Sequence, residues 1–163
     1  MSQRRIVMGR IGGCDQIVSD EAVEAVPVAA DGVCVHAVWG SDEVAKVPSD
    51  GQEPLQSAGF PNGTGFRYSV LTIPAGASDA YHEFIKTSLG AYASSDVAGM
   101  HWTPTVDCIV LTQGELELEG DDGKVVVRAG DSVIINGNRH RWTNAGPQDA
   151  ILHAISLGAE ASE

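Results

Sequence analysis

Cysteine is scarce in this chain, and its few occurrences argue against a disulfide framework. Three cysteines occur in 163 residues, at positions 14, 34 and 108, and no two of them have the spacing of a CxxC motif. An odd, scattered set favours free thiols in a reducing compartment. We therefore expect a cytoplasmic protein, which agrees with an N-terminus that has no continuous apolar segment.

Basic residues and long apolar runs are also scarce. The chain has 10 Lys and Arg against 22 Asp and Glu, which gives a formal net charge of −12. A field of this sign repels phosphate backbones and anionic lipid surfaces. No apolar run approaches the length of a membrane-spanning helix. We therefore expect neither nucleic acid nor membrane as a partner.

Short runs rich in Val, Ile and Thr recur between clusters of Gly, Pro, Asp and Asn. This pattern is typical of an all-β fold, and the length favours a single domain over residues 1–163, with N-terminal strands and a loop in 1–60 and a barrel in 66–157. The predicted strands are Ile6–Arg10, Gln16–Ser19, Val33–Trp39, Phe66–Ile73, Val106–Thr112, Glu115–Glu119, Lys124–Arg128, Ser132–Ile135, Arg141–Thr143 and Ile151–Leu157.

One segment departs from the strand pattern. Over residues 79–92, large apolar side chains fall at helical spacing: Tyr81, Phe84, Ile85, Leu89 and Tyr92. This spacing predicts a short amphipathic helix packed across the barrel. The same helix would also suit a lid over the mouth of a pocket, because it comes just before the first polar cluster described next.

A cluster of polar residues indicates a metal site. On an extended chain His101, Thr103, Thr105 and Asp107 share one face, and His140 follows a turn later in the sequence. Inward polar side chains in a barrel are costly unless they bind one another, water or a metal ion. Two histidines and a carboxylate form a ligand set that suits Fe(II) and also accepts Zn, Mn, Co or Ni. A hydrogen-bonded polar pocket that has lost its ion is the alternative.

At these residues the chain resembles the cupins. The first cupin motif, G-x5-H-x-H-x3,4-E-x6-G, is matched at His101 and Gly114, while Thr103 replaces the second histidine and Asp107 replaces the glutamate. The second motif, G-x5-P-x-G-x2-H-x3-N, is matched by Gly130, Gly137, His140 and Asn144. Its proline is absent, and the gap between the two glycines is one residue short. The resemblance implies a cupin-type β-barrel, also called a double-stranded β-helix or jelly roll.

The chain is further similar to small single-domain cupins of polyketide and aromatic pathways. The similar segments are Arg67–Gly76, Asp121–Gly123 and Gly137–Trp142. This resemblance implies a lyase, either a decarboxylase or a dehydratase, or an isomerase that acts on a small oxygenated acid or a polyketide-like aromatic. It also implies a homodimer formed through N-terminal strands. An Fe(II) dioxygenase with the same three ligands and a non-catalytic small-molecule-binding cupin remain as alternatives.

Further residues are candidates for parts of the site. Thr103, His153 and His82 are the candidates for handling a proton, although His153 also suits a structural position in a strand. Arg67, Tyr68 and Phe84 are candidates for substrate binding, with a salt bridge as the alternative for Arg67. At most one of Arg67 and Tyr68 can face the cavity, because neighbours on a strand alternate. Trp102 and Trp142 are expected to pack in the outer layer.

Overall fold

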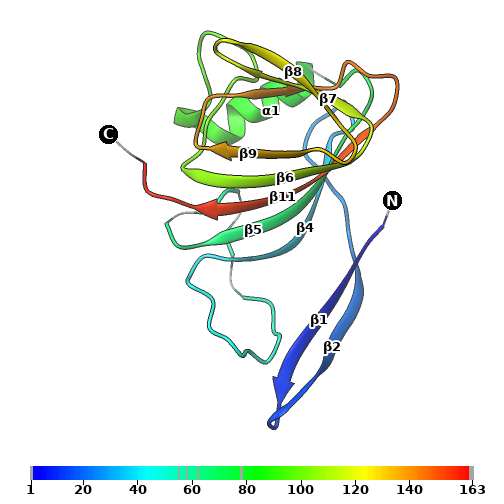
Figure 1. Cartoon of the computed structure of the whole chain (residues 1–163), viewed down its shortest axis with the longest axis vertical. Helices are drawn as coiled ribbons and strands as arrows, with labels where there is room; N and C mark the ends of the chain where they lie inside the picture. Colours follow the sequence, from blue (N-terminus) through cyan, green and yellow to red (C-terminus); the bar gives the residue numbers. More distant parts are fainter. Residues whose placement is uncertain (1, 55, 58, 62, 78, 162–163) are drawn as a thin grey trace.

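The computed structural model describes residues 2–54, 56–57, 59–61, 63–77 and 79–161. Over these residues the chain consists mainly of strands, with one α-helix and one short 3-10 helix (Figure 1). In chain order the elements are β1 (Gln3–Ile11), β2 (Cys14–Val23), β3 (Val26–Pro27), β4 (Cys34–Ser41), β5 (Phe66–Ile73), α1 (Asp79–Leu89), η1 (Gly90–Tyr92), β6 (Thr105–Gln113), β7 (Glu115–Gly120), β8 (Gly123–Arg128), β9 (Ser132–Asn136), β10 (Arg141–Thr143) and β11 (Ala150–Gly158).

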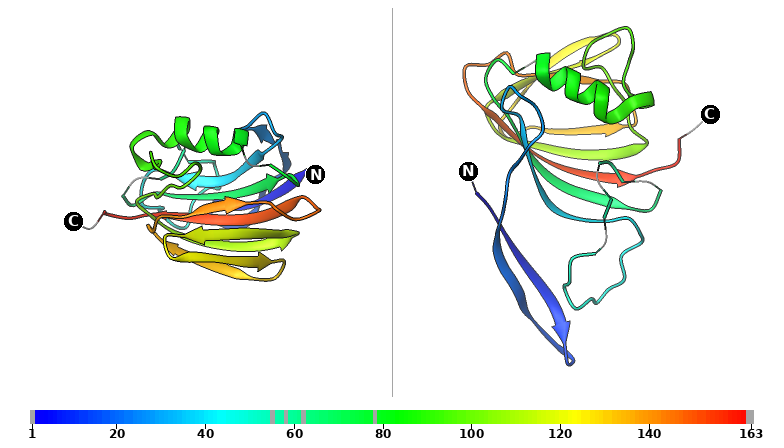
Figure 2. Two further views of the ribbon diagram at one scale, coloured as in Figure 1. Left: turned by 90° about the horizontal axis from the view of Figure 1, so that it is seen from above. Right: turned by 180° about the vertical axis from the view of Figure 1, so that it is seen from behind.

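Two antiparallel sheets form a β-barrel. The larger sheet has the strand order β3-β4-β5-β11-β6-β9, and the smaller has the order β10-β7-β8. Buried side chains of the larger sheet, such as Leu111 and Leu152, belong to one core cluster with Leu116 and Val127 of the smaller. The two sheets therefore enclose a common apolar interior. Figures 1 and 2 show how the strands curve around it. Burial of these side chains is the main source of stability.

The helix packs against this core. Tyr81 and Ile85 are each 5% exposed, and Phe84 and Leu89 lie against the same cluster half-buried. Burial raises the pKa of the Tyr81 phenol to about 12, with a smaller contribution from the nearby Asp31 carboxylate. The predicted amphipathic helix is therefore confirmed, and its last turn continues as η1. A role as a lid stays a prediction.

The N-terminal hairpin extends away from the barrel (Figures 1 and 2). Strands β1 and β2 form a separate two-stranded sheet, which we call the arm. One face of the arm is tied to the rest of the chain. There the Arg5 guanidinium binds Glu53 at 3.0 Å and lies 5.2 Å from the Trp39 ring centroid, and Arg10 N–H donates to the Ser49 carbonyl. The opposite face carries exposed apolar side chains.

The predicted strands are all present within observed strands, with small differences at their ends. The two-residue strand β3, which pairs with β4, was missed because two residues give no alternation. The expectation for Trp142 was wrong. Trp142 is 5% exposed and belongs to the core cluster, because it lies two residues from the inward-facing His140 and so shares its side of β10.

None of the helices among the described residues is both long and apolar enough to cross a membrane.

Candidate metal centre

Two histidines from distant parts of the chain face each other inside the barrel. His101 and His140 form an isolated antiparallel bridge, with the two backbone N–H···O=C bonds at 2.9 and 2.8 Å. Residues paired in this way direct their side chains to the same side. The two imidazole centroids are accordingly 4.4 Å apart, and both residues are buried. The sequence expectation that these histidines come together is thus met in the structure.

Each imidazole is held by the backbone of its own loop. Nδ1–H of His101 donates to the Gly99 carbonyl at 2.9 Å, and Nδ1–H of His140 donates to the Asn138 carbonyl at 2.8 Å. These bonds place the proton of the neutral ring on Nδ1 and leave the lone pair on Nε2. Ligating histidines in metalloproteins are held by partners of this kind.

Burial keeps the two rings neutral. Desolvation, with a smaller contribution from the neighbouring His140, lowers the pKa of His101 to about 4. Desolvation also lowers the pKa of His140, although its bond to Asn138 and the Asp107 carboxylate act in the opposite direction. At neutral pH both Nε2 atoms therefore carry lone pairs, which metal binding requires.

Two threonine hydroxyl groups are linked by hydrogen bonds to the Asp107 carboxylate. Thr103, Thr105 and Asp107 are all buried, which agrees with their predicted common face. The Thr103 and Thr105 hydroxyl oxygens are 2.8 Å apart, and the Thr105 hydroxyl donates to Asp107 Oδ2 at 2.9 Å. The other carboxylate oxygen, Oδ1, is buried and no described residue hydrogen-bonds to it. A buried carboxylate oxygen without a partner is costly, and a cation would satisfy it.

The donor atoms are therefore of the types that bind a metal ion, but the side chains are not close enough together to form a complete site. Among the described residues, no three His, Cys, Asp or Glu side chains lie close enough together to hold a metal ion. The two histidines meet at the bridge, whereas Asp107 lies further along β6, where it pairs with Ile135. The position between them, which carries a histidine in the cupin motif, is occupied by the hydroxyl of Thr103.

Two of the other candidates lie on the outer face of the larger sheet. Ser156 pairs with Asp107 and shares its inward face, while His153, three residues earlier on β11, points outward. There His153 Nδ1 is 2.8 Å from the Tyr68 hydroxyl. The structure thus brings Tyr68 and His153 to each other and away from His101, so neither lines the barrel interior as predicted.

The remaining candidates have three different positions. Arg67 is buried in an ion pair with Asp42 and also donates to the Ser41 carbonyl at 2.9 Å, so the salt bridge that was its alternative is the structure observed. Its hydrogen bond to Asp42 holds the pKa of that carboxyl below the ordinary value. Phe84 packs against the core cluster. His82 lies near the centre, because its ring packs against Gly99, two residues before His101.

Sequence reasoning missed the backbone groups that orient the two imidazoles, Gly99 and Asn138. The signal for both was present, since each lies two residues before a histidine in a turn-forming segment. It also left Asn144, the last residue of the second motif, without a role. Asn144 is 1% exposed, donates to the Ile73 and Gln148 carbonyls and accepts from Gly146 N–H, so it joins the end of β5 to the turn after β10.

Comparisons with known proteins agree with this architecture. The cupin domain family matches residues 89–156. The cupin domain of Cnp3 from Schizosaccharomyces pombe is similar at 12% identity and a TM-score of 0.51, over 97% of this chain and 89% of that one. A cupin 2 conserved barrel domain protein from Salinispora arenicola has 17% identity and a TM-score of 0.47, with 80% of each chain covered.

A predicted oxalate decarboxylase from Thermotoga maritima has 15% identity and a TM-score of 0.46, over 83% of this chain and 90% of that one. At identities this low, similarity to solved structures concerns the fold alone. A search of curated proteins gave no match.

Proposed function

We propose that the chain is a cupin and that it is a metal-dependent enzyme acting on a small oxygenated acid; the match of the cupin domain family to residues 89–156 supports the first part. The proposed reaction is that of a lyase, a decarboxylase or dehydratase, or of an isomerase. The observation that carries the proposal is the buried pair His101 and His140, each fixed through Nδ1 with Nε2 left as a ligand. His101 and His140 would hold the ion, with Asp107 as the third ligand.

The bound ion would supply Lewis acidity toward substrate oxygens, and iron, zinc, manganese, cobalt or nickel each fit the donor types. The chain supplies the other requirements of such a site. Burial excludes water from the imidazoles, and the Asp107 carboxylate offsets part of the charge of a divalent ion. The hydroxyls of Thr103 and Thr105 form the nearest hydrogen-bonded path by which a proton can be held or moved beside Asp107.

Oxygen uptake during turnover tests the reaction class. Protein loaded in turn with each of the five metals is incubated with a panel of small hydroxy and keto acids, and substrate loss, CO2 release and dissolved oxygen are followed together. We expect substrate loss without oxygen uptake, and no turnover by a His140→Ala control. One O2 consumed per substrate would instead establish the dioxygenase that uses the same residue set. Binding of an acid without any turnover would establish a non-catalytic cupin.

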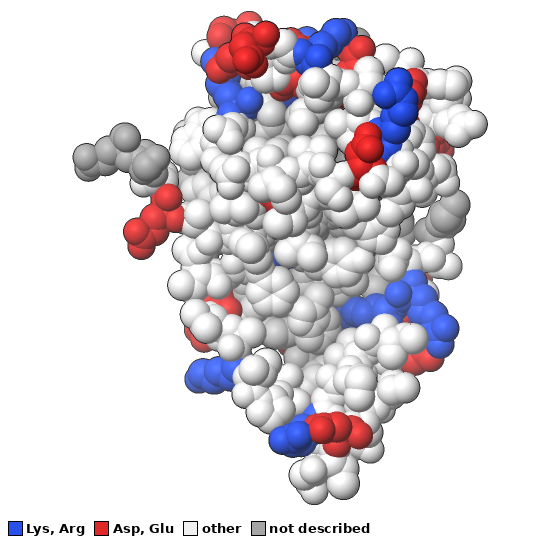
Figure 3. Space-filling view, in the orientation of Figure 1, with Lys and Arg blue, Asp and Glu red and all other residues white. Residues whose placement is uncertain are grey.

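We also propose that the protein forms a homodimer in which the arm covers a second copy. The outer face of the arm carries Ile6, Met8 and Ile17, between the ion pairs Arg4–Asp20 and Arg10–Asp15. The outer face of the larger sheet exposes Val110, Ile134 and Ile155 and is nearly free of charge (Figure 3). Chains that each carry a net charge of −12 associate best through such uncharged faces. An isolated two-stranded hairpin also needs a packing partner.

Charge placed on the arm is expected to produce monomers. In a Met8→Asp, Ile17→Asp variant, two carboxylates would lose hydration at the interface, and we expect dimer affinity to fall by about 100-fold or more. Sedimentation velocity at micromolar concentration measures this change. Val125→Asp is the matched control, because Val125 is equally apolar and exposed but lies on β8, at the far end of the molecule from the arm. A wild-type monomer, or an unchanged dimer in the arm variant, would contradict the proposal.

A further inference from the structure

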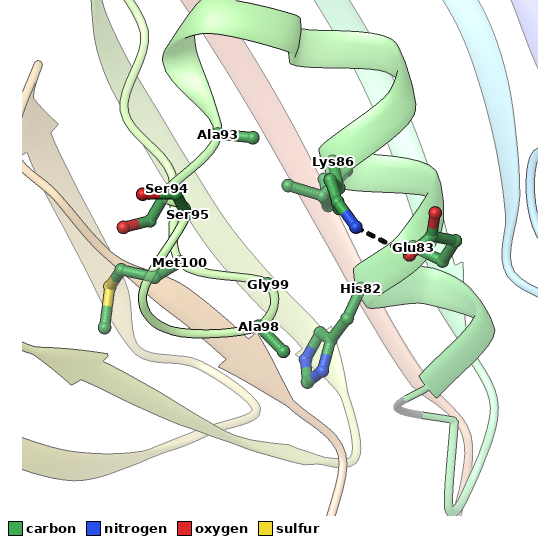
Figure 4. A pocket seen from close by; sticks show the side chains of 10 residues that line it. His82, Glu83, Lys86, Ala93, Ser94, Ser95, Ala98, Gly99 and Met100 are labelled. Carbon is green, nitrogen blue, oxygen red and sulfur yellow. Dashed lines mark ion pairs between the residues drawn. The ribbon is translucent and has the colours of Figure 1, made fainter.

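A cavity lies between α1 and the loop that leads to His101. Its volume is about 320 Å³, and it is lined by four helix residues between 82 and 86 and by six loop residues between 93 and 100. Figure 4 shows the helix on one side, with Lys86, Glu83 and His82, and the loop on the other. Ile85 and Met100, both buried, provide its apolar lining. A volume of this size is at the lower end of the range for small-molecule sites.

The cavity lies beside the histidine pair. Ala93, which lines it, forms an antiparallel bridge with His101, and His101 in turn forms one with His140. Because bridged residues direct their side chains to one side, Ala93, His101 and His140 share one face. His82 also connects the two regions, since its ring fills the space beside the Gly99 Cα atom.

Two polar groups of the helix are available to a ligand in this cavity. His82 Nε2 is buried, and none of the described residues hydrogen-bonds to it. Lys86 Nζ is 3.7 Å from Glu83 Oε2, which is an ion pair longer than a hydrogen bond. Such a surface pair contributes little, and the ammonium group has three N–H donors. Lys86 can therefore accept a second carboxylate while it stays beside Glu83.

We propose that this cavity binds the substrate of the centre, a small carboxylic acid with a neighbouring hydroxyl or carbonyl oxygen and a short apolar body. Lys86 pairs with the carboxylate, His82 Nε2 bonds to the neighbouring oxygen, and Ile85 and Met100 contact the apolar part. The assignment deepens the proposed function and rests on it for the statement that the ligand is a substrate. The chain has a net charge of −12 and so repels anions as a whole, and the positive charge of Lys86 offsets this repulsion locally for a carboxylate ligand.

Salicylate and 2-hydroxybenzyl alcohol form a matched pair of probes, because they share the ring and the hydroxyl and differ in the carboxylate. Titration calorimetry measures the affinity of the metal-free and the metal-loaded protein for each. We expect Lys86→Gln to weaken salicylate binding by about tenfold and to leave alcohol binding unchanged. His82→Phe keeps the ring beside Gly99 and removes its nitrogens, so it is expected to weaken both probes by about fivefold.

Lys124→Gln is the matched control, because Lys124 forms a similar exposed pair with Glu117 on the β7–β8 hairpin. It should leave both affinities unchanged. Amide chemical shifts of residues 93–100 should move when salicylate is added. The proposal fails if the wild-type protein binds no salicylate, or if both helix variants bind it as the wild type does. Salicylate bound only by metal-loaded protein, with those shifts unmoved, would also overturn it.

Metal content, measured on the same samples, separates this proposal from the proposed function. If salicylate binds at residues 93–100 of a protein that takes up no metal, the proposed binding cavity stands and the proposed metal-dependent enzyme is contradicted. If the protein takes up metal but does not bind salicylate, only the proposed binding cavity is contradicted.

Discussion

Replacing His140 with alanine is expected to abolish metal binding at neutral pH. The variant loses one of two fixed Nε2 donors, and His101 then faces an empty space where the second ring was 4.4 Å away. Loss of a partner that only orients a ligand costs about 10–100-fold in metal affinity. Loss of the ligand itself should cost more. Elemental analysis of protein purified without chelators is the direct measurement.

Thermal unfolding gives an independent measure of the same effect. At a free metal concentration 100 times Kd, binding stabilises the native state by about 2.7 kcal/mol. In a chain of this size that corresponds to a rise in Tm of about 5–10 °C. We expect wild-type protein to lose this rise when a chelator is added. His140→Ala should have the same Tm with and without the chelator.

Two companion variants make the result specific. His153→Ala removes a histidine on the outer face, whose partner is the Tyr68 hydroxyl, and should leave metal content unchanged. Asp107→Asn retains an oxygen that can accept the Thr105 hydroxyl and removes the negative charge. We expect it to lower metal affinity by at least about 10-fold if Asp107 acts as the third ligand. Full metal content in His140→Ala would contradict the proposed centre. An unchanged metal affinity in Asp107→Asn would show that Asp107 is not a ligand.

The sequence was sufficient to predict the barrel because barrel strands repeat a local pattern. The segment Glu115–Glu119 alternates Leu with Glu, and the structure buries Leu116 in the core while the glutamates remain partly exposed. The register of β7 with β8 is fixed by the short turn between them, at which Gly120 pairs with Gly123. Local chemistry was therefore enough for these elements.

The site was less predictable because it depends on which face of each strand turns inward. The alternation of Tyr68 with Arg67, and of His153 with its neighbours, was visible, but the inward face was not. Only the pairing of β11 with β5 and β6 shows that His153 points outward. The meeting of His101 with His140 likewise depends on a bridge between residues 39 positions apart in the sequence.

Gly99 connects the fold to the site, and Gly99→Ala is expected to damage both. Gly99 has φ of +76°, and a Cβ atom added there would lie 2.2 Å from Cδ2 of the His82 ring. The left-handed backbone costs about 1–2 kcal/mol for alanine, and the overpacking against His82 costs about 1–3 kcal/mol more. Urea unfolding should therefore show a loss of about 2–5 kcal/mol. Gly90→Ala is the control, because its φ is also positive and nothing lies within 4 Å.

The contribution from overpacking against His82 can be removed by a second substitution, so the physical cause of the destabilisation can be tested. In Gly99→Ala, His82→Ala the ring is gone, so the combined loss of stability should be smaller than the sum of the single losses by about 1–3 kcal/mol. The Gly99 carbonyl accepts the Nδ1 proton of His101, so displacement of the loop should also lower metal affinity. The double variant should recover part of that affinity. Additive losses would show that the clash with His82 is relieved by other movements, and that the loop position does not depend on this ring.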